Sequence, residues 1–316
     1  MLAVVLALAA AVSYSGSDYV AGLASRGTSV IRVTAVAQII NAILIIPVVP
    51  LLSSQGPSAR SLVWGAAAGV SGVIGTVALY MGFRHAAFSV ASTVSAVGSA
   101  AFSVIAGLLL GERPAALSLA GIALALPAIA SVSASTGQPN ADHVPASARA
   151  AADADGSDAD ETRGDPAGRP VRSATGRHAA GVVWGLIAGV AIGLFFIFLN
   201  RAGSGSDLWP LAAAELAAVL AVVCMAAVTS QLRLPDPGTR WLSLLTGITA
   251  AAGTLFYFLA THHGLLAVTA VITTLDPAGT IVLARVLLGE RLTAVRVAGL
   301  CLAAASVALI AVAGAA

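Results

Sequence analysis

A carboxylate in the middle of a long apolar segment is the side chain best placed for chemistry in this sequence. Asp276 lies near the centre of residues 265–288, and Pro277 follows it directly. A charged carboxylate at that depth in a bilayer costs about 2.5–3.5 kcal/mol on insertion scales, and protonation or a wet cavity would remove the cost. We expect Asp276 to exchange a proton; the alternative is that it hydrogen-bonds Thr273 or Thr274 and only braces a kink.

Pro277 predicts an interruption of this segment. Proline has no backbone N–H, and its ring clashes with the carbonyl group four residues earlier, here that of Thr273. A freed carbonyl inside a membrane must bind another polar group or line a cavity. We therefore expect the helix to open at Asp276 and Pro277, where a solute could bind.

Five further side chains are candidates for the same pathway. Glu215 lies inside an Ala- and Leu-rich segment, where it could bind a proton or cation or join a hydrogen bond between helices. Asp18 and Arg32 lie at facing ends of the first two apolar segments and could pair, most simply for architecture. Tyr14 and Tyr257 lie deep in their segments; they could line a cavity, although packing across helices is the simpler role.

The composition places these residues in a membrane. The chain is 58% hydrophobic and 9% charged over 316 residues, whereas soluble domains are about 25% charged. Windows of about 20 apolar residues, enough to cross a hydrocarbon core, predict an all-α polytopic membrane protein with ten transmembrane helices. The first window has no positively charged stretch before it, which favours a membrane helix over a signal peptide. The windows are 2–22, 30–52, 62–82, 86–109, 115–134, 179–200, 208–230, 241–262, 265–288 and 294–314.

The chain repeats itself. The string Leu-Leu-Gly-Glu-Arg occurs at Leu109–Arg113 and again at Leu287–Arg291, an offset of 178 (289 minus 111 for the two glycines). The same offset aligns Tyr80 with Phe258 without a gap. The repeated unit is therefore a set of membrane helices, five in each half.

The halves are predicted to be inverted repeats. Residues 1–135 and 179–316 each contain an odd number of crossings, so the second copy must enter the bilayer from the opposite side. Such bundles can rock about a central site and expose it to each side in turn. Residues 136–178 are rich in Ala, Asp, Ser, Gly, Pro and Arg and are expected to form a disordered hydrophilic linker.

Other function classes find little support. The net charge of +2 gives no reason to expect nucleic acid as a partner, and Cys224 and Cys301 both lie in apolar runs. His262 and His263 are adjacent, so on a helix they point about 100° apart and do not suggest a metal site. No catalytic triad, phosphate loop or nucleotide fingerprint occurs. We expect neither an enzyme nor a cofactor.

The glycines fall into two meaningful patterns. Gly65 and Gly69, like Gly185, Gly189 and Gly193, recur every fourth residue, which lets helix backbones approach closely, most simply within one chain. The glycines of the two Leu-Gly-Glu turns, Gly111 and Gly289, can end a helix in the left-handed conformation. This makes Glu112 and Glu290 turn residues near the surface.

The loop arginines give a weak signal for orientation. Counted by the positive-inside rule, they favour termini on the outside. Both orientations remain open. The loops on the side of the termini carry Arg60, Arg113 and Arg201, and the other side carries Arg26, Arg84, Arg233, Arg240, Arg291 and the linker.

Residues Thr273–Leu302 resemble the closing half of an EamA-type repeat of the drug/metabolite transporter superfamily. The pattern is a carboxylate followed by proline, a Leu-Gly-Glu turn and a final helix with an early glycine. It is found here in Asp276, Pro277, Leu288-Gly289-Glu290 and Gly299. The first half matches through Leu110-Gly111-Glu112 and Gly121, and Arg32 resembles an arginine often found early in the second helix. Gly98 aligns with Asp276, so only the second half supplies the acid.

The resemblance implies a ten-helix carrier of the inner membrane, often an exporter of amino acids, other small metabolites or drugs, with a central cavity. We expect a secondary transporter that uses alternating access and is coupled to protons through Asp276. An uncoupled facilitator and a non-transporting receptor or assembly protein are the alternatives. The expected partners are a zwitterionic, neutral or amphipathic solute, protons and the lipid bilayer, with the chain a monomer or a homodimer.

Overall fold

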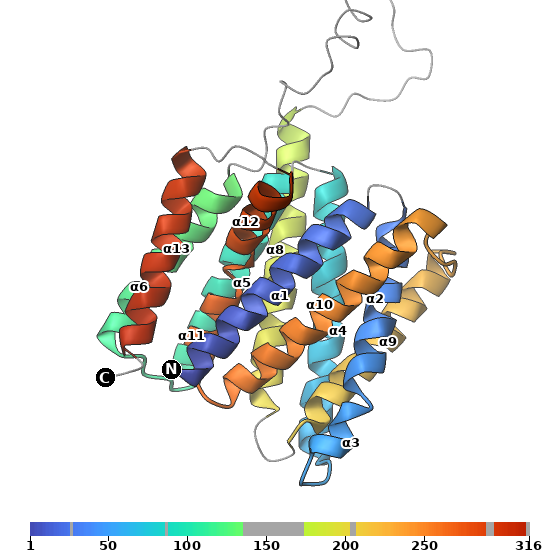
Figure 1. Cartoon of the computed structure of the whole chain (residues 1–316), viewed down its shortest axis with the longest axis horizontal. Coiled ribbons are helices and arrows are strands. Elements are labelled where there is room, and N and C mark those ends of the chain that lie inside the picture. The colour runs from blue at the N-terminus through green and yellow to red at the C-terminus, as the bar shows by residue number, and fades with distance from the viewer. Residues whose placement is uncertain (26–27, 86–87, 135–173, 203–206, 289–293, 314–316) are drawn as a thin grey trace, which may run out of the picture.

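The computed structural model describes residues 1–25, 28–85, 88–134, 174–202, 207–288 and 294–313, which form a bundle of helices and no strand (Figure 1). Most of the expected linker and the second Leu-Gly-Glu turn lie outside these residues. The helices are α1 (Leu2–Ala24), α2 (Val30–Ile45), α3 (Val48–Leu52), α4 (Ala59–His85), α5 (Phe88–Leu109), α6 (Ala116–Ala134), α8 (Ala174–Arg201), α9 (Trp209–Val228), α10 (Pro237–Thr261), α11 (Leu266–Thr273), α12 (Asp276–Leu288) and α13 (Ala294–Ala313).

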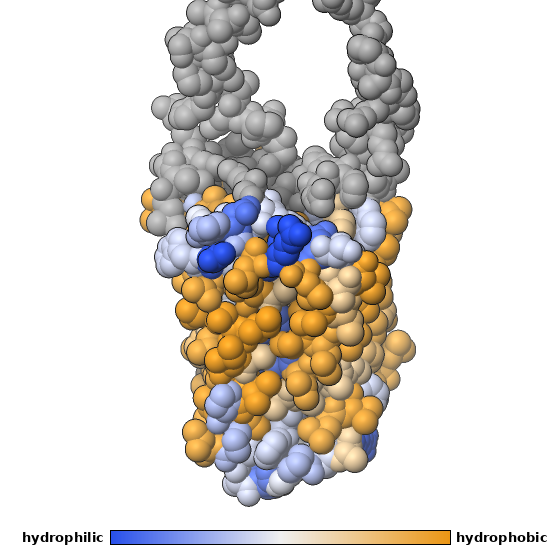
Figure 2. Space-filling view, turned by 90° about the vertical axis from the view of Figure 1, so that its right-hand side faces the viewer, coloured by the Kyte–Doolittle hydropathy of each residue, from blue (hydrophilic) through white to orange (hydrophobic). Residues whose placement is uncertain are grey.

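Every apolar window of the sequence is helical. Among the described residues, six helices are long and apolar enough to cross a membrane, and four shorter apolar helices fill the other windows. On the face seen in Figure 2, a broad apolar band covers the middle of the bundle and gives way to hydrophilic side chains near its ends. The prediction of an all-helical, multi-pass membrane protein is confirmed. The largest difference at an end of a segment is at α8, which begins at Ala174, ahead of residue 179.

Two of the windows contain a break at or near a proline. The window 30–52 divides into α2 and α3 around Pro47, and the window 265–288 divides into α11 and α12 just before Pro277. Proline removes a backbone donor in both places. The second break is where the sequence predicts an opening of the helix.

The packing pairs recur between the two halves. α1 packs along α10 as α4 packs along α8; α2 meets α10 as α9 meets α4; α5 lies on α8 as α11 and α12 lie on α1. The pairs α6 with α13 and α2 with α9 complete the bundle (Figure 1). When every helix is exchanged for its counterpart 178 residues away, each of the first three pairs turns into its partner in the comparison, and the pairs α6 with α13 and α2 with α9 turn into themselves.

The glycines permit these contacts. A methyl group at Gly69 would overlap the Ala214 carbonyl, and one at Gly247, 178 residues later, would lie 2.5 Å from the Ala37 carbonyl oxygen. A methyl group at Gly189 would lie 3.0 Å from the carbonyl oxygen of Ser95. The glycine-lined faces therefore pack within the chain, between α4 and α9, α10 and α2, and α8 and α5.

We call the end where α1 ends and α10 begins the upper end, as in Figure 1, and the opposite end the lower end. Buried residues of α8, α9, α10 and α11 fill the lower end of the bundle. Tyr257, Phe258, Leu199 and Leu211 are among its fully buried side chains. The interior is thus closely packed at the lower end, and a cavity lies above this packing.

Candidate functional site

A cavity of about 240 Å³ lies between the two halves of the chain, many times the volume that one buried water needs. Helices from both halves line it, α1, α2, α4 and α5 from the first and α8 to α12 from the second. Its lining reaches Ala21, Val33 and Leu79, within about two helical turns of the upper end. The cavity is therefore the natural place to look for a solute site.

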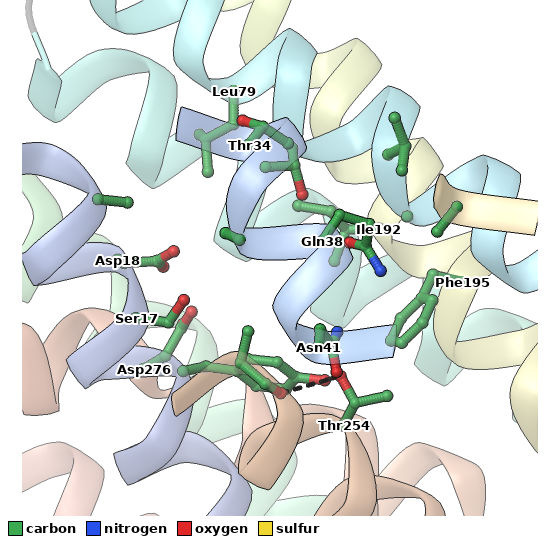
Figure 3. A pocket seen from close by; sticks show the side chains of 18 of the residues that line it. Ser17, Asp18, Thr34, Gln38, Asn41, Leu79, Ile192, Phe195, Thr254 and Asp276 are labelled. Atoms are coloured by element: carbon green, nitrogen blue, oxygen red, sulfur yellow. Dashed lines mark hydrogen bonds between the residues drawn. The ribbon is translucent and has the colours of Figure 1, made fainter. Parts of the chain in front are cut away.

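Two carboxyl groups meet on one wall. Asp18 of α1 and Asp276, the first residue of α12, are hydrogen-bonded through their side chains and face the same space (Figure 3). An ionised carboxylate has no donor, so two carboxyl groups form such a bond only when at least one holds a proton. This wall can therefore take up and release a proton.

The break between α11 and α12 sets the position of Asp276. Leu275 N donates to the Ile272 carbonyl oxygen at 3.2 Å, which tightens the last turn of α11. Ser15 Oγ of α1 donates to the Asp276 carbonyl oxygen at 2.7 Å and ties the start of α12 to α1. The backbone of the break is thus anchored on the helix that carries Asp18.

The threonines beside the break do not hold the Asp276 carboxyl group. Thr274 Oγ1 donates to the Val271 carbonyl oxygen at 2.9 Å, within its own helix. Thr273 Oγ1 is buried and has no hydrogen-bond partner. Neither hydroxyl donates to the Asp276 carboxyl group in these bonds, and the role of Asp276 stays a prediction.

A third acid lies in the lining, held by two amides. Glu215 of α9 is 3% exposed, and Gln38 Nε2 donates to its Oε2 at 2.5 Å. Asn41, about one turn further along α2, also hydrogen-bonds Glu215 through its side chain. Its Oδ1 atom remains buried without a partner.

Aromatic rings supply much of the remaining surface. The Tyr14 hydroxyl of α1 donates to Thr254 Oγ1 of α10 at 3.1 Å. Phe195 of α8 extends toward the cavity from the side of Gln38, opposite Asp18 (Figure 3), and Tyr80 lines the cavity near its upper end. Small apolar side chains fill the gaps between these rings, so the cavity is mostly apolar with a few polar groups.

The structure brings most of the expected site residues together. Tyr14, Asp18, Glu215, Asp276 and Pro277 all line the cavity. This clustering joins residues from α1, α9 and α12, which are far apart in the chain. It agrees with a shared pathway, and their functional roles stay predictions.

Two expected residues lie outside the lining. Arg32 is not among the lining residues, the Asp18 side chain bonds Asp276, and Arg32 Nε is buried without a partner. Tyr257 is 0% exposed and donates its hydroxyl to the Phe196 carbonyl oxygen at 3.2 Å. The tyrosine takes the packing role, because its ring fills the space beneath the cavity.

Sequence reasoning missed the amides that hold Glu215. Gln38 and Asn41 lie on one face of α2 inside a strongly apolar segment. Uncharged polar side chains at that depth are a recognisable signal, since each must find a partner across helices. Their spacing of three residues would have identified the pair.

The α2–α9 contact is held at both ends. At the lower end Asp207 Oδ2 accepts from Gln55 N at 2.8 Å, Ser54 Oγ at 2.9 Å and Ser54 N at 2.6 Å. These bonds, that of Gln55 first, hold the pKa of Asp207 below its ordinary value. At the upper end Ser29 Oγ donates to Gln231 Oε1. We refer to this contact as the α2–α9 seam.

Glu112 joins the two halves at another place. Gly111 has φ +90°, and Glu112 N donates to the Gly107 carbonyl oxygen at 3.0 Å, which confirms the predicted left-handed end of the helix. The Glu112 carboxylate accepts from Leu266 N at 2.6 Å and Ala267 N at 3.0 Å, the first donors of α11. Glu112 is therefore a turn residue that caps a helix of the other half.

The histidines take a structural position. His262 Nδ1 lies 2.8 Å from the Phe258 carbonyl oxygen at the end of α10, where a helix presents unpaired acceptors. Within the described ranges no group of three or more metal-ligating side chains occurs.

Comparison with known proteins gives a family and a fold. The model of the EamA-like transporter family matches residues 1–134 and 179–312. No curated protein matches the chain. One solved structure, described as "Crystal structure of protein", is similar with a TM-score of 0.70 and 13% sequence identity, covering 97% of this chain and 95% of that chain.

Proposed function

The chain belongs to the EamA-like transporter family, and on that premise we propose that it is a secondary carrier that exports a small organic solute across the inner membrane by alternating access. The carboxyl pair of Asp18 and Asp276 carries the coupling proton. The observation on which the proposal chiefly depends is that this pair lies in a cavity between the two halves. Solute and proton can then be exchanged from one space.

Inverted repeats would explain the composition of the lining. Residues separated by 178 positions often line the cavity together, as expected if a pseudo-two-fold axis passes through it. The acids differ in chemistry from their counterparts: Asp18 corresponds to Phe196 and Glu215 to Ala37, which both line the cavity, and Asp276 corresponds to Gly98, which is not in the lining. The other lining residues at matching positions are Tyr14 and Ile192, Ser17 and Phe195, Gly72 and Ala250, Thr76 and Thr254, Ser95 and Thr273, Ala96 and Thr274, and Ser99 and Pro277.

The inverted repeat also suggests which helices move during transport. The bonds of Ser29 to Gln231 and of Leu208 to Ser53 lie at opposite ends of the α2–α9 seam; Ser53 corresponds to Gln231, and Leu208 corresponds to Val30, the residue after Ser29. A contact that is held alike at both ends can remain in place while the other helices rock about it. We propose that the seam is the pivot and that α1, α4, α8 and α10 open and close the two ends.

The test compares small molecules in cells and medium for cells carrying the intact protein, Asp276→Asn or no protein. We expect at least one compound to leave the cells only when the intact protein is present, and its export to fall at least tenfold in Asp276→Asn. Asp236→Asn, which removes an exposed carboxylate outside the cavity, is the matched control and should export normally. A profile identical in all cells under every growth condition would contradict transport.

The control for coupling is the dependence of export on the pH gradient. A proton-coupled carrier loses concentrative export when the gradient is collapsed. Export that is indifferent to the gradient would instead establish the uncoupled facilitator.

A further inference from the structure

We infer that the transported solute carries a protonated amine, which Glu215 and Asn41 bind while an apolar or aromatic body lies against Phe195. The inference rests on the proposed function only in that the cavity receives a solute. It concerns the chemical class of that solute.

The charges of the lining point in one direction. Among the described residues that line the cavity, Asp18, Glu215 and Asp276 are acidic and none is Arg, Lys or His. The hydrogen bond between Asp18 and Asp276 requires one proton, and Glu215 lies apart from it on α9. An anionic solute would enter beside these carboxyl groups without a basic partner. A cationic solute would find an acidic partner in Glu215.

An unpartnered acceptor marks where the cation binds. Asn41 is 4% exposed and lines the cavity, and its Oδ1 atom has no hydrogen-bond partner. An amide oxygen only accepts, so it lacks a donor, and a buried acceptor without one costs about 1–3 kcal/mol in general. The missing group is a donor supplied by the solute.

The neighbouring bonds fix the arrangement of the site. The Asn41 side chain also bonds Glu215, and Gln38 Nε2 donates to the same carboxylate. The amide groups therefore hold Glu215 in place and leave the Asn41 oxygen beside it. An ammonium group has three donors and can bind the carboxylate and this oxygen together.

The rest of the cavity suits an apolar body of limited size. Phe195 and Ile192 extend from α8 into the cavity on the same side as Gln38 (Figure 3). An aromatic face also attracts a nearby cation. The volume of about 240 Å³ fits a small arylalkyl or alkyl amine rather than a peptide.

The experiment measures binding of three matched probes to the purified full chain in lipid nanodiscs by isothermal calorimetry. The probes are 2-phenylethylamine, 2-phenylethanol and 3-phenylpropionate, which are cationic, neutral and anionic. We expect the amine to bind at least tenfold more tightly than either of the others. Glu215→Gln should abolish this preference, Glu215→Asp should retain part of it, and Asp236→Asn should leave it unchanged.

Several outcomes would overturn the inference. Equal binding of the amine and the alcohol, tighter binding of the anion, or no binding of the amine up to millimolar concentration would each do so. The comparison within the intact protein holds even if Glu215→Gln fails to fold. Because no gradient or flux is involved, a failure of transport leaves the order of binding intact, and an absent amine preference leaves transport of another solute possible.

Discussion

The Tyr257 hydroxyl donates to the Phe196 carbonyl oxygen at 3.2 Å, and the centroids of the two rings lie 4.5 Å apart. This contact joins α10 to α8 directly beneath the cavity, and both side chains are buried. This ring pair and its hydrogen bond are therefore part of the packing that closes the lower end. Opening it would require α10 to move from α8.

Tyr257→Phe should weaken this closure. The ring remains and still packs, but the Phe196 carbonyl loses a donor, a change worth about 0.5–1.5 kcal/mol for a typical hydrogen bond. We expect faster hydrogen–deuterium exchange in peptides covering residues 195–201 and 255–261. Tyr19→Phe, in the upper half of α1, is the control. Unchanged exchange in both variants would show that the hydroxyl does not hold the lower end closed.

The proposed inverted repeat predicts how the upper end closes. Phe195 and Tyr257, whose centroids are 6.2 Å apart, correspond to Ser17 and Leu79 at the offset of 178. In a chain lacking its native cysteines, Ser17→Cys with Leu79→Cys should form a disulfide when the upper end closes. The cross-link should arrest flux, and reduction should restore it. Undiminished flux in the fully cross-linked protein would contradict the assignment of this pair to the upper closure.

The fold could be predicted more fully than the site. Length and hydropathy sufficed to place the helices, because a segment crossing a membrane must bond its own backbone. Pro277 likewise predicted the break at Asp276. The partner of Asp18 could not be predicted, because α1 and α12 are far apart in the chain and their packing has no local signal in the sequence. Arg32 was expected to pair with Asp18 because the two residues lie in consecutive apolar segments.

Asp207→Gly should loosen the lower end of the α2–α9 seam. Asp207 has φ +44°, which glycine adopts without strain, so the change removes the acceptor and retains the backbone. We expect faster exchange at Ser54 and Gln55 at neutral pH. Asp207→Asn, which keeps one acceptor and tolerates the same φ, should be intermediate. Equal exchange in all three proteins would rule out a role for the carboxylate.

The intact seam should also respond to acid in one direction. Because the folded pKa of Asp207 is lowered, its bonds stabilise the protein above the ordinary Asp value of about 3.9 and are lost as the pH falls through the lowered value. Exchange at residues 53–56 should therefore follow its normal pH dependence from pH 5 to 8 and show added opening only in stronger acid. Opening that begins near pH 6 would contradict this.

Glu112→Ala should destabilise the junction between the halves. Two backbone donors at the start of α11 lose the carboxylate that accepts from them, and loss of a comparable helix cap costs about 1 kcal/mol. We expect a lower midpoint of thermal unfolding in detergent, followed by size-exclusion chromatography. Glu112→Gln retains one acceptor, so its unfolding midpoint should lie between those of the intact protein and Glu112→Ala. A midpoint equal to that of the intact protein would show that the cap is dispensable.

Asp276→Asn provides the most direct test of the central claim, that the carboxyl pair couples solute movement to protons. The intact protein and the variant are reconstituted in liposomes with an imposed pH gradient, and uptake of the exported compound is followed. We predict that the intact protein accumulates the compound against its concentration, whereas Asp276→Asn still exchanges it but cannot accumulate it. Equal gradient-driven accumulation by both proteins would contradict the account.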